Sequence, residues 1–256
     1  MSIYQHFRPE ERGFIDQVLN WKDFVENKYA PKLTDYLDPR EQQILKTIIG
    51  QQTINLGFFG GSPHTERKRA LLYPDYYQET EDDFHVSLFE VKYPSKFIHL
   101  THPQVLGSLM SIGLKRDKFG DILLADERIQ FFCAEEISDY VKLEVQSIGK
   151  ASVDLIQQPL SETILQKEQW IEMMITASSI RIDTIISSIY KISRQKSQVL
   201  IHSGLVKVNW TVIESTSFEC GEGDTISVRG FGRSKIFSFD GKSKKEKWKI
   251  IIGRQK

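Results

Sequence analysis

Cysteine is scarce in this chain of 256 residues, which contains only Cys133 and Cys220. The two lie far apart and neither belongs to a Cys-x-x-Cys pair, so a disulfide framework and a multi-cysteine zinc site are excluded. No apolar run approaches the roughly 18 residues that span a bilayer. The first residues, MSIYQHFRPEERGF, lack the basic and apolar segments of a secretory signal. We therefore expect a soluble, cytoplasmic protein.

Signatures of catalysis are also missing. The six histidines show no His-x-x-x-His spacing and have no nearby cysteine, and no Gly-x-Ser-x-Gly elbow is present. The Gly-rich loop at Gly60 and Gly61 lacks the Lys-Ser/Thr of a Walker loop and the third glycine of a dinucleotide fingerprint. We expect no catalytic residues, no metal site and no cofactor. The Arg67-Lys68-Arg69 run that follows this loop is interpreted as the start of a surface helix, with RNA contact as the alternative.

The chain as a whole has no excess of either charge, but its two parts carry opposite excesses. The composition is ordinary for a globular protein, with 34 basic and 34 acidic side chains. Residues 1–166 hold 18 basic and 25 acidic side chains, whereas residues 167–256 hold 16 and 9. The last 16 residues carry seven basic side chains and one acidic one. This asymmetry predicts a polyanion-binding region at the C-terminal end, or else a solvated basic tail.

The N-terminal stretch, residues 1–80, has the periodicity of helices. Apolar residues recur at spacings of four, three and four, on one helix face: Phe14, Val18, Trp21 and Val25. A second helix is predicted to begin at Asp38 as N-cap, with Pro39 in the first turn and Glu41 completing a capping box. Its apolar face comprises Ile44, Leu45, Ile48 and Ile49. We expect a helical N-terminal domain over residues 1–80.

The middle stretch, residues 81–165, alternates strand and helix signals. Strands are predicted at 84–91, 119–125, 128–133 and 150–157, and helices at 102–112 and 135–145, the first capped by Thr101. The order β-α-β-β-α-β is typical of a ferredoxin-like domain. Phe131 and Phe132 are adjacent and so point to opposite sheet faces, which places at least one in the core and gives no base-stacking signature.

The third stretch, residues 168–256, predicts two short helices on a small sheet. One helix buries Ile182, Ile185, Ile186 and Ile189; the next is capped by Ser193 and ends at Gly204 as a left-handed cap. Short strands are expected in LVKVNW, TVIES and DTISVRG. Arg181, Arg194, Lys196 and Lys207 project from this helix pair and first strand. Arginine and lysine on a helix surface suit the phosphates of folded RNA. The overall fold class is α+β.

This third stretch resembles the S-four RNA-binding domain, named after a ribosomal protein. The spaced matches to its pattern are Arg181, Asp183, Ser193, Arg194, Leu200, Ile201, Gly204, Val206, Val208, Asn209, Gly223, Asp224, Arg229, Gly230, Gly232 and Arg233. Asp183 is interpreted as structural, holding Arg181 or Lys196. One departure stands out, because the pattern has glycine where this chain has Trp210. Tryptophan tolerates positive φ poorly, so we expect a rearranged turn that exposes Trp210 to solvent or RNA.

The order of domains is similar to that of the YlmH family, with LGSLMSIGLKRDKFGDIL (106–123) as the most recognisable segment outside the S-four domain. That resemblance implies a bacterial, non-catalytic RNA-binding protein that acts on rRNA or tRNA of the large ribosomal subunit, in translation or in rescue of stalled ribosomes. Within 106–123, three cations lie on a predicted loop: Lys115, Arg116 and Lys118. We interpret the loop as a phosphate contact, with a solvated loop as the alternative.

The expected RNA-binding residues are Arg181, Arg194, Lys196, Lys207, Asn209, Arg229, Arg233, Lys115, Arg116 and Lys118. Lysines 242, 244, 245, 247 and 249 of the tail would add affinity without specificity. Two other functions stay open. One is an RNA-modifying enzyme of pseudouridine-synthase type with an unrecognised catalytic domain in residues 1–166; the other is an interaction protein of the division machinery. An Arg194→Glu, Lys196→Glu double variant is expected to lose RNA association and keep its fold.

Overall fold

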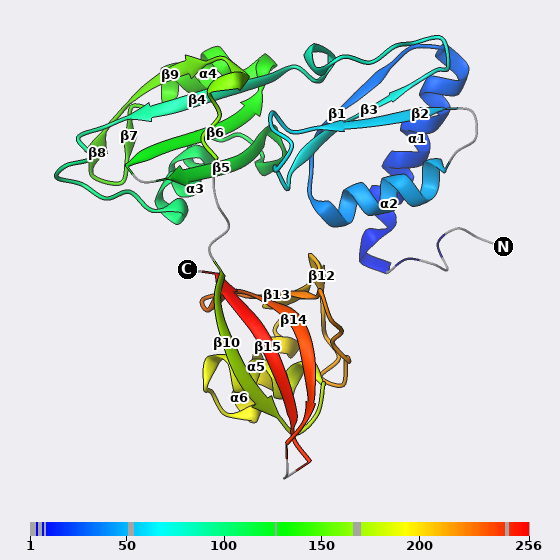
Figure 1. Cartoon of the computed structure of the whole chain (residues 1–256). Helices are drawn as coiled ribbons and strands as arrows, with labels where there is room; N and C mark the ends of the chain where they lie inside the picture. The colour runs from blue at the N-terminus through cyan, green and yellow to red at the C-terminus, as the bar shows by residue number, and fades with distance from the viewer. Residues whose placement is uncertain are drawn as a thin grey trace. The chain divides into compact units, whose positions relative to one another are not determined.

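The computed structural model describes residues 4, 7, 9–50, 54–125, 127–165, 170–243 and 246–255. The chain divides into two compact units, residues 1–166 and 167–256 (Figure 1). Both expected domains upstream of residue 166 thus lie in one unit. Among the described residues, no helix combines the length and apolarity that crossing a membrane would require.

The first part of the N-terminal unit mixes helices with a sheet, so the helical expectation for residues 1–80 was wrong in part. The expected helices are present, but three strands join them in an antiparallel sheet of order β1-β3-β2. These strands are short, and central β3 is buried at four consecutive positions, so no alternation signals it. The elements are η2 (Pro9–Glu11), α1 (Arg12–Lys28), β1 (Lys32–Leu37), α2 (Pro39–Ile49), β2 (Asn55–Phe59) and β3 (Lys68–Tyr73).

Helix α2 begins as its sequence predicts. The Asp38 carboxylate accepts a hydrogen bond from the Glu41 backbone N–H at 2.9 Å, and the Glu41 carboxylate accepts one from the Asp38 N–H at 2.7 Å. This capping box pairs two donors that a helix start otherwise leaves unsatisfied. Helix α1 buries Val18 and Val25, and the predicted apolar face of α2 is buried against them.

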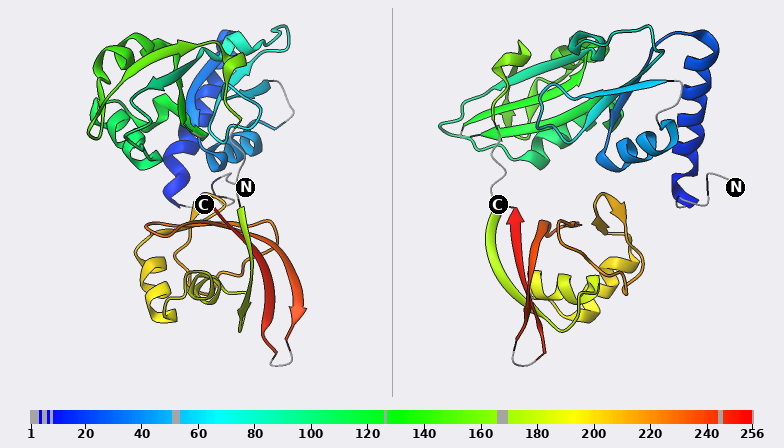
Figure 2. Two further views of the ribbon diagram at one scale, coloured as in Figure 1. Left: turned by 60° about the vertical axis from the view of Figure 1, so that its left-hand side comes forward. Right: turned by 45° about the vertical axis from the view of Figure 1, so that its right-hand side comes forward.

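The second part of this unit has the ferredoxin-like arrangement that was predicted. Its antiparallel sheet has the order β5-β6-β4-β9, which places the first and third strands in the centre (labelled in Figure 1, with two further views in Figure 2). The predicted strand at 150–157 is instead a small β7–β8 hairpin followed by β9. The elements are η3 (Glu81–Phe84), β4 (Val86–Lys92), α3 (His102–Ser111), η4 (Arg116–Lys118), β5 (Phe119–Ala125), β6 (Arg128–Ala134), η5 (Glu135–Ile137), α4 (Ser138–Glu144), β7 (Ser147–Ile148), β8 (Ala151–Ser152), β9 (Asp154–Gln158) and η6 (Leu160–Glu162).

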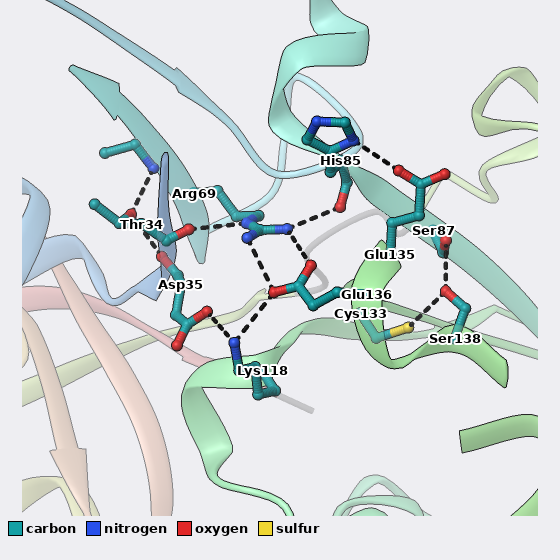
Figure 3. Close-up of polar contacts among 11 residues, drawn as sticks. Thr34, Asp35, Arg69, His85, Ser87, Lys118, Cys133, Glu135, Glu136 and Ser138 are labelled. Carbon is teal, nitrogen blue, oxygen red and sulfur yellow. Dashed lines mark hydrogen bonds and ion pairs between the residues drawn. The ribbon is translucent and has the colours of Figure 1, made fainter. Parts of the chain in front are cut away.

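Arg69 joins the two sheets of this unit (Figure 3). Its side chain is 4% exposed and donates to Glu136 through both terminal nitrogens, at 3.0 and 3.2 Å. It also donates to the backbone carbonyls of Thr34 and His85, each at 2.9 Å. Lys118 extends the cluster by donating to Asp35 at 2.6 Å and to Glu136 at 3.1 Å. One guanidinium on β3 therefore connects β1 and the residue just before β4 with η5.

The Arg67-Lys68-Arg69 run is consequently not the start of a surface helix. Lys68 begins strand β3, Arg69 is buried, and Arg67 donates to the carbonyls of Tyr36 at 2.9 Å and Phe119 at 3.2 Å. Asp121 accepts the backbone N–H groups of Glu66 and Arg67, and burial raises the pKa of its carboxyl. A basic run that looks like a surface feature in sequence is part of the joint between the two sheets.

The C-terminal unit consists of two helices packed on one face of a six-stranded antiparallel sheet, of order β10-β15-β14-β13-β11-β12. Most of the described residues of the basic C-terminal tail are in strands, because they form the end of β14 and all of β15. Strand β15 pairs on both sides, with β10 and with β14. The elements are β10 (Trp170–Ala177), α5 (Ile182–Tyr190), α6 (Arg194–His202), β11 (Val206–Val208), β12 (Thr211–Val212), β13 (Thr225–Val228), β14 (Gly232–Lys242) and β15 (Trp248–Gln255).

The helix pair forms as predicted. All four isoleucines of the α5 face are buried, and Ser193 caps α6 by accepting the Lys196 backbone N–H at 3.1 Å. Gly204 has φ +67° and donates to the Ile201 carbonyl, and Leu205 donates to the Leu200 carbonyl. These two hydrogen bonds form the Schellman motif, which requires a residue that tolerates positive φ at the helix end.

Arg69→Ala should destabilise the N-terminal unit by about 3–5 kcal/mol, because it leaves buried carbonyls and the Glu136 carboxylate without their donor. Urea unfolding of the whole protein measures this loss. The matched control is Lys22→Ala, which breaks an i,i+4 pair with Glu26 (3.9 Å); the Lys22 side chain is 23% exposed against 4% for Arg69, and its loss should change stability by about 0.5 kcal/mol or less. Equal unfolding midpoints for the two variants would contradict the joint assigned to Arg69.

Candidate nucleic-acid interface

Asp183 is the buried centre of the S-four helix pair. Its side chain is fully buried and accepts hydrogen bonds from Arg194 Nε at 2.9 Å, Arg181 Nε at 3.3 Å and Gln198 Nε2 at 3.1 Å. Burial raises the pKa of this carboxyl, but the donors from Arg194, Gln198 and Arg181 outweigh it, so the pKa lies below its usual value. Asp183 has the structural role that was expected of it. It holds Arg181, one of the two expected partners, and it holds Arg194 rather than Lys196.

This carboxylate fixes two of the expected RNA-binding arginines. The side chain of Arg194 is 52% exposed and that of Arg181 is 36% exposed, so each meets Asp183 on one side and solvent on the other. A guanidinium has five N–H donors in a rigid fork. Holding part of the fork on a buried carboxylate orients the remaining donors at the surface before any phosphate arrives.

Lys196 lies on the exposed first turn of α6, beside an aromatic pair. Its Nζ is 5.7 Å from the centre of the Phe231 ring, and Phe231 lies 5.2 Å from the Tyr190 ring. Arg254 of strand β15 places its guanidinium 5.4 Å from the Tyr190 ring. Sequence reasoning counted Arg254 only as part of the tail, because nothing local indicates that β15 returns to the helix pair.

Lys207, Arg229 and Arg233 lie on the sheet and its β13–β14 turn. Lys207 pairs with Ser227, which in turn pairs with Arg233. The side chains of Lys207, Ser227 and Arg233 therefore lie in one row on one face of the sheet. The flanking Val206 and Val208 are buried against the helices, so this row faces away from them. Arg229 is exposed in the turn, at residues 229–231 between the two strands.

Asn209 holds the β11–β12 turn. Its amide donates to Asp224 at 2.7 Å, and its side-chain oxygen accepts the Thr225 backbone N–H at 2.9 Å. The expectation of a rearranged turn at Trp210 was wrong: Asn209 and Trp210 have φ values of 47° and 64° in an ordinary two-residue hairpin. Left-handed backbone costs a non-glycine residue about 1–2 kcal/mol, and the Asn209 bonds hold the turn in place.

The 115–118 loop is used mainly within the protein. Arg116 donates to the carbonyls of Phe119 at 2.6 Å and Gly120 at 3.2 Å, and burial lowers its pKa to about 10. Lys118 is bound to Asp35 and Glu136. Of the three cations, Lys115 is the exposed one. The structure therefore gives Arg116 and Lys118 bonds that do not require RNA.

The face of the ferredoxin-like sheet that lies away from its helices is filled by protein. Phe132 and Tyr36 are both fully buried there, while Phe131 is buried on the helix side. Gln130 accepts the backbone N–H of Ile164 and donates to the Glu162 carbonyl, so the segment after β9 covers part of this face. No exposed aromatic pair for base stacking was expected in this domain, and both central phenylalanines lie in its core.

A neighbouring buried carboxylate on this face is paired as well. Glu90 accepts hydrogen bonds from Arg128 at 2.6 Å, Lys92 at 2.5 Å and Gln130 at 3.3 Å. The Arg128 bond, with help from Lys92 and Gln130, lowers the Glu90 pKa to about 2 in spite of burial. The carboxylate is thus held ionised as part of the sheet and is unsuited to a general acid or base near neutral pH.

Three of the five lysines of the expected tail, Lys242, Lys247 and Lys249, lie on the β14–β15 hairpin. Lys242 ends β14, with its Nζ 3.4 Å from Glu246 and 5.4 Å from the centre of the Trp248 ring. Lys247 is exposed, and Lys249 is half-buried on β15. Lys244 and Lys245 lie outside the described residues. No group of three His, Cys, Asp or Glu side chains in the described ranges could hold a metal ion, and burial raises the pKa of both thiols to about 12.

Asp183→Asn should lower the free energy of unfolding of the C-terminal unit by about 1–3 kcal/mol at neutral pH, since it removes the charge that both arginines meet. The wild-type pKa is depressed below 3.8, so the advantage is present above about pH 4 and is lost as pH falls through the lowered pKa. Thermal unfolding of both proteins across this range measures it. Glu172→Gln, an exposed carboxylate on β10, is the control; the same pH profile for both variants would contradict the role of Asp183.

Each of the two units of the chain matches a known family model. Residues 79–162 match a family model described as "Putative RNA-binding domain in YlmH", and residues 180–226 match one described as "S4 domain". A Bacillus subtilis (strain 168) protein named "Ribosome-associated protein quality control protein P2" is 46% identical over 255 residues, which is 100% of this chain and 99% of that protein.

A solved structure supports the same assignment. "Cell division protein ylmH from Streptococcus pneumoniae" is 36% identical, with a TM-score of 0.56, and the match covers 64% of this chain and 100% of that chain. The two domain matches follow one another along the chain, as they were expected to. Together with 46% identity over the full length to the Bacillus protein, they show that this chain belongs to the YlmH family.

Proposed function

We propose that this protein docks on structured RNA of the large ribosomal subunit, rRNA or tRNA, and acts in translation or in the rescue of stalled ribosomes. The observation that carries the proposal is the set of cations held on rigid elements of the S-four unit. Arg181 and Arg194 are fixed by one buried carboxylate, and Lys196 and Arg229 are exposed in the same unit, on α6 and in the β13–β14 turn.

The proposed mechanism is electrostatic. Lysine and arginine side chains neutralise phosphates and release condensed counterions, which supplies affinity without reading sequence. The C-terminal unit suits this role because residues 167–256 hold seven more basic than acidic side chains. The fixed arginines lose little side-chain freedom on binding, since Asp183 has already ordered them.

The ribosome is proposed as the partner because the similar Bacillus protein is described by its name as ribosome-associated and as a quality control protein. Residues 1–166 carry seven more acidic than basic side chains, so RNA contact by the part that matches the putative RNA-binding domain, residues 79–162, would depend on local cations rather than on overall charge. In the proposal this unit sets where the protein sits, through protein contacts or through the exposed Lys115. The S-four unit supplies the RNA contact.

The structure changes which variant tests this surface best. Arg194→Glu, the change first expected to leave the fold intact, would place a carboxylate against buried Asp183 and so disturb the helix pair. Lys196→Glu combined with Arg229→Glu reverses two exposed cations that lack such a role. This double variant should lose ribosome association and keep the wild-type unfolding temperature. The measurement is co-sedimentation with ribosomes on gradients, with and without ribonuclease.

The matched control is Lys28→Glu with Lys142→Glu, which makes the same charge change on exposed positions of the N-terminal unit. It should sediment with the large subunit as the wild type does. Association should fall by about 100-fold between about 50 and 200 mM salt if roughly four phosphates are neutralised. Wild-type protein that stays at the top of the gradient at low salt, or equal binding of both double variants, would contradict the proposal.

A further inference from the structure

A tryptophan stands at the tip of the β11–β12 hairpin, where backbone conformation favours glycine. Trp210 has φ +64° and follows Asn209 at φ +47°. The hairpin is otherwise regular, with Lys207 opposite Val212 and Val208 opposite Thr211. Folding alone would select glycine or asparagine in such a turn. Strain of this kind, held in place by surrounding bonds, points to a use for the side chain itself.

The indole is half-buried rather than enclosed in the core. It does not belong to the hydrophobic cluster of the C-terminal unit, whose buried members on β11 are Val206 and Val208. The ring lies beside a cation: the Arg233 guanidinium is 5.7 Å from its centre. The side chain is therefore a partly exposed aromatic ring with a guanidinium beside it. It lies in the turn that follows β11, the strand that carries Lys207.

The sheet around this pair is positively charged. The outward positions of β11, β13 and the first half of β14 are residues 207, 225, 227, 233 and 235, which alternate with buried residues on the same strands. They comprise Lys207, Arg233 and Lys235 with one serine and one threonine, and none of the five is acidic. A polyanion that reaches Trp210 across this face meets three cations and no carboxylate at these positions.

We propose that Trp210 and Arg233 form a stacking site for one unpaired base of the bound RNA, with Lys207 and Lys235 on the flanking phosphates. An aromatic ring stacks on any base because every base has a π face, and arginine adds a planar cation to the same stack. The site would thus recognise an unpaired nucleotide by its exposure rather than by its identity. This inference rests on the proposed function. It adds a second RNA contact, on the face of the sheet that points away from the helices.

The test uses the full-length protein and two short RNA hairpins, one with a single bulged 2-aminopurine and one fully paired. Fluorescence anisotropy gives the affinity, and quenching of 2-aminopurine reports stacking. Trp210→Gly should weaken binding to the bulged hairpin by about 5- to 100-fold and abolish the quenching, with little effect on the paired hairpin. Because glycine suits the turn, the variant should retain a cooperative thermal transition.

Two further variants separate stacking from general effects. Trp210→Phe keeps a π face and should restore quenching and most of the affinity. Met174→Ala removes an exposed apolar side chain from β10 of the same unit and should bind both hairpins as the wild type does. The Lys196→Glu, Arg229→Glu variant should lose affinity for both hairpins, because it removes phosphate contacts that do not depend on the bulge.

The outcomes distinguish this inference from the proposed function. If Trp210→Gly binds and quenches like the wild type, or weakens both hairpins equally, the stacking site is wrong while RNA docking by the S-four unit stands. If the wild-type protein binds neither hairpin, and the charge reversals also leave ribosome sedimentation unchanged, the proposed function fails and the stacking site fails with it.

Discussion

A charged group that leaves water must find a partner inside the protein, and this constraint organises both units of the chain. In the N-terminal unit, Arg69 is buried and bonds to Glu136 and to the backbone carbonyls of Thr34 on β1 and of His85, just before β4. In the C-terminal unit, Asp183 is buried and bonds to Arg181, Arg194 and Gln198. Arg69 is satisfied only when segments distant in sequence are in place, whereas the partners of Asp183 come from the neighbouring helix pair, within 15 residues along the chain.

The two buried charges have different consequences. Arg69 and its partners are used inside the protein, so they make one compact unit of two sheets. Asp183 instead meets arginines that remain exposed on their other side. A structural carboxylate thereby prepares cations for an external anion. This division agrees with the charge of the chain, whose basic excess lies in the unit that Asp183 organises.

The ferredoxin-like domain shows that a fold shared with RNA-recognition motifs need not use the same surface. Its sheet buries Phe132 and Tyr36 on the face where such motifs present aromatic rings. Gly61 and Gly120 approach Phe132 so closely that a side chain at either position would collide with its ring or Cβ atom. The sheet therefore serves as an internal layer of the N-terminal unit, and the RNA contacts that we propose lie on the S-four unit.

Much of the fold could be predicted from local sequence. The capping box at Asp38, the isoleucine face of α5, the cap at Ser193 and the left-handed Gly204 are determined within a few residues, and each is present. The βαββαβ order also follows from periodicity, since each element has its own apolar pattern. The S-four pattern identified the residues around Asp183 before any contact was known.

Long-range pairing decided the rest. The Arg67-Lys68-Arg69 run and the basic C-terminal residues resemble solvated segments in sequence, yet one forms a buried joint and the other the doubly paired strand β15. Arg254 reaches Tyr190 only because that strand returns to the helix pair. Sequence by itself determined the local elements and their caps, because those depend on neighbouring residues. Only the tertiary structure decided which cations stay in water, because burial depends on what packs against them.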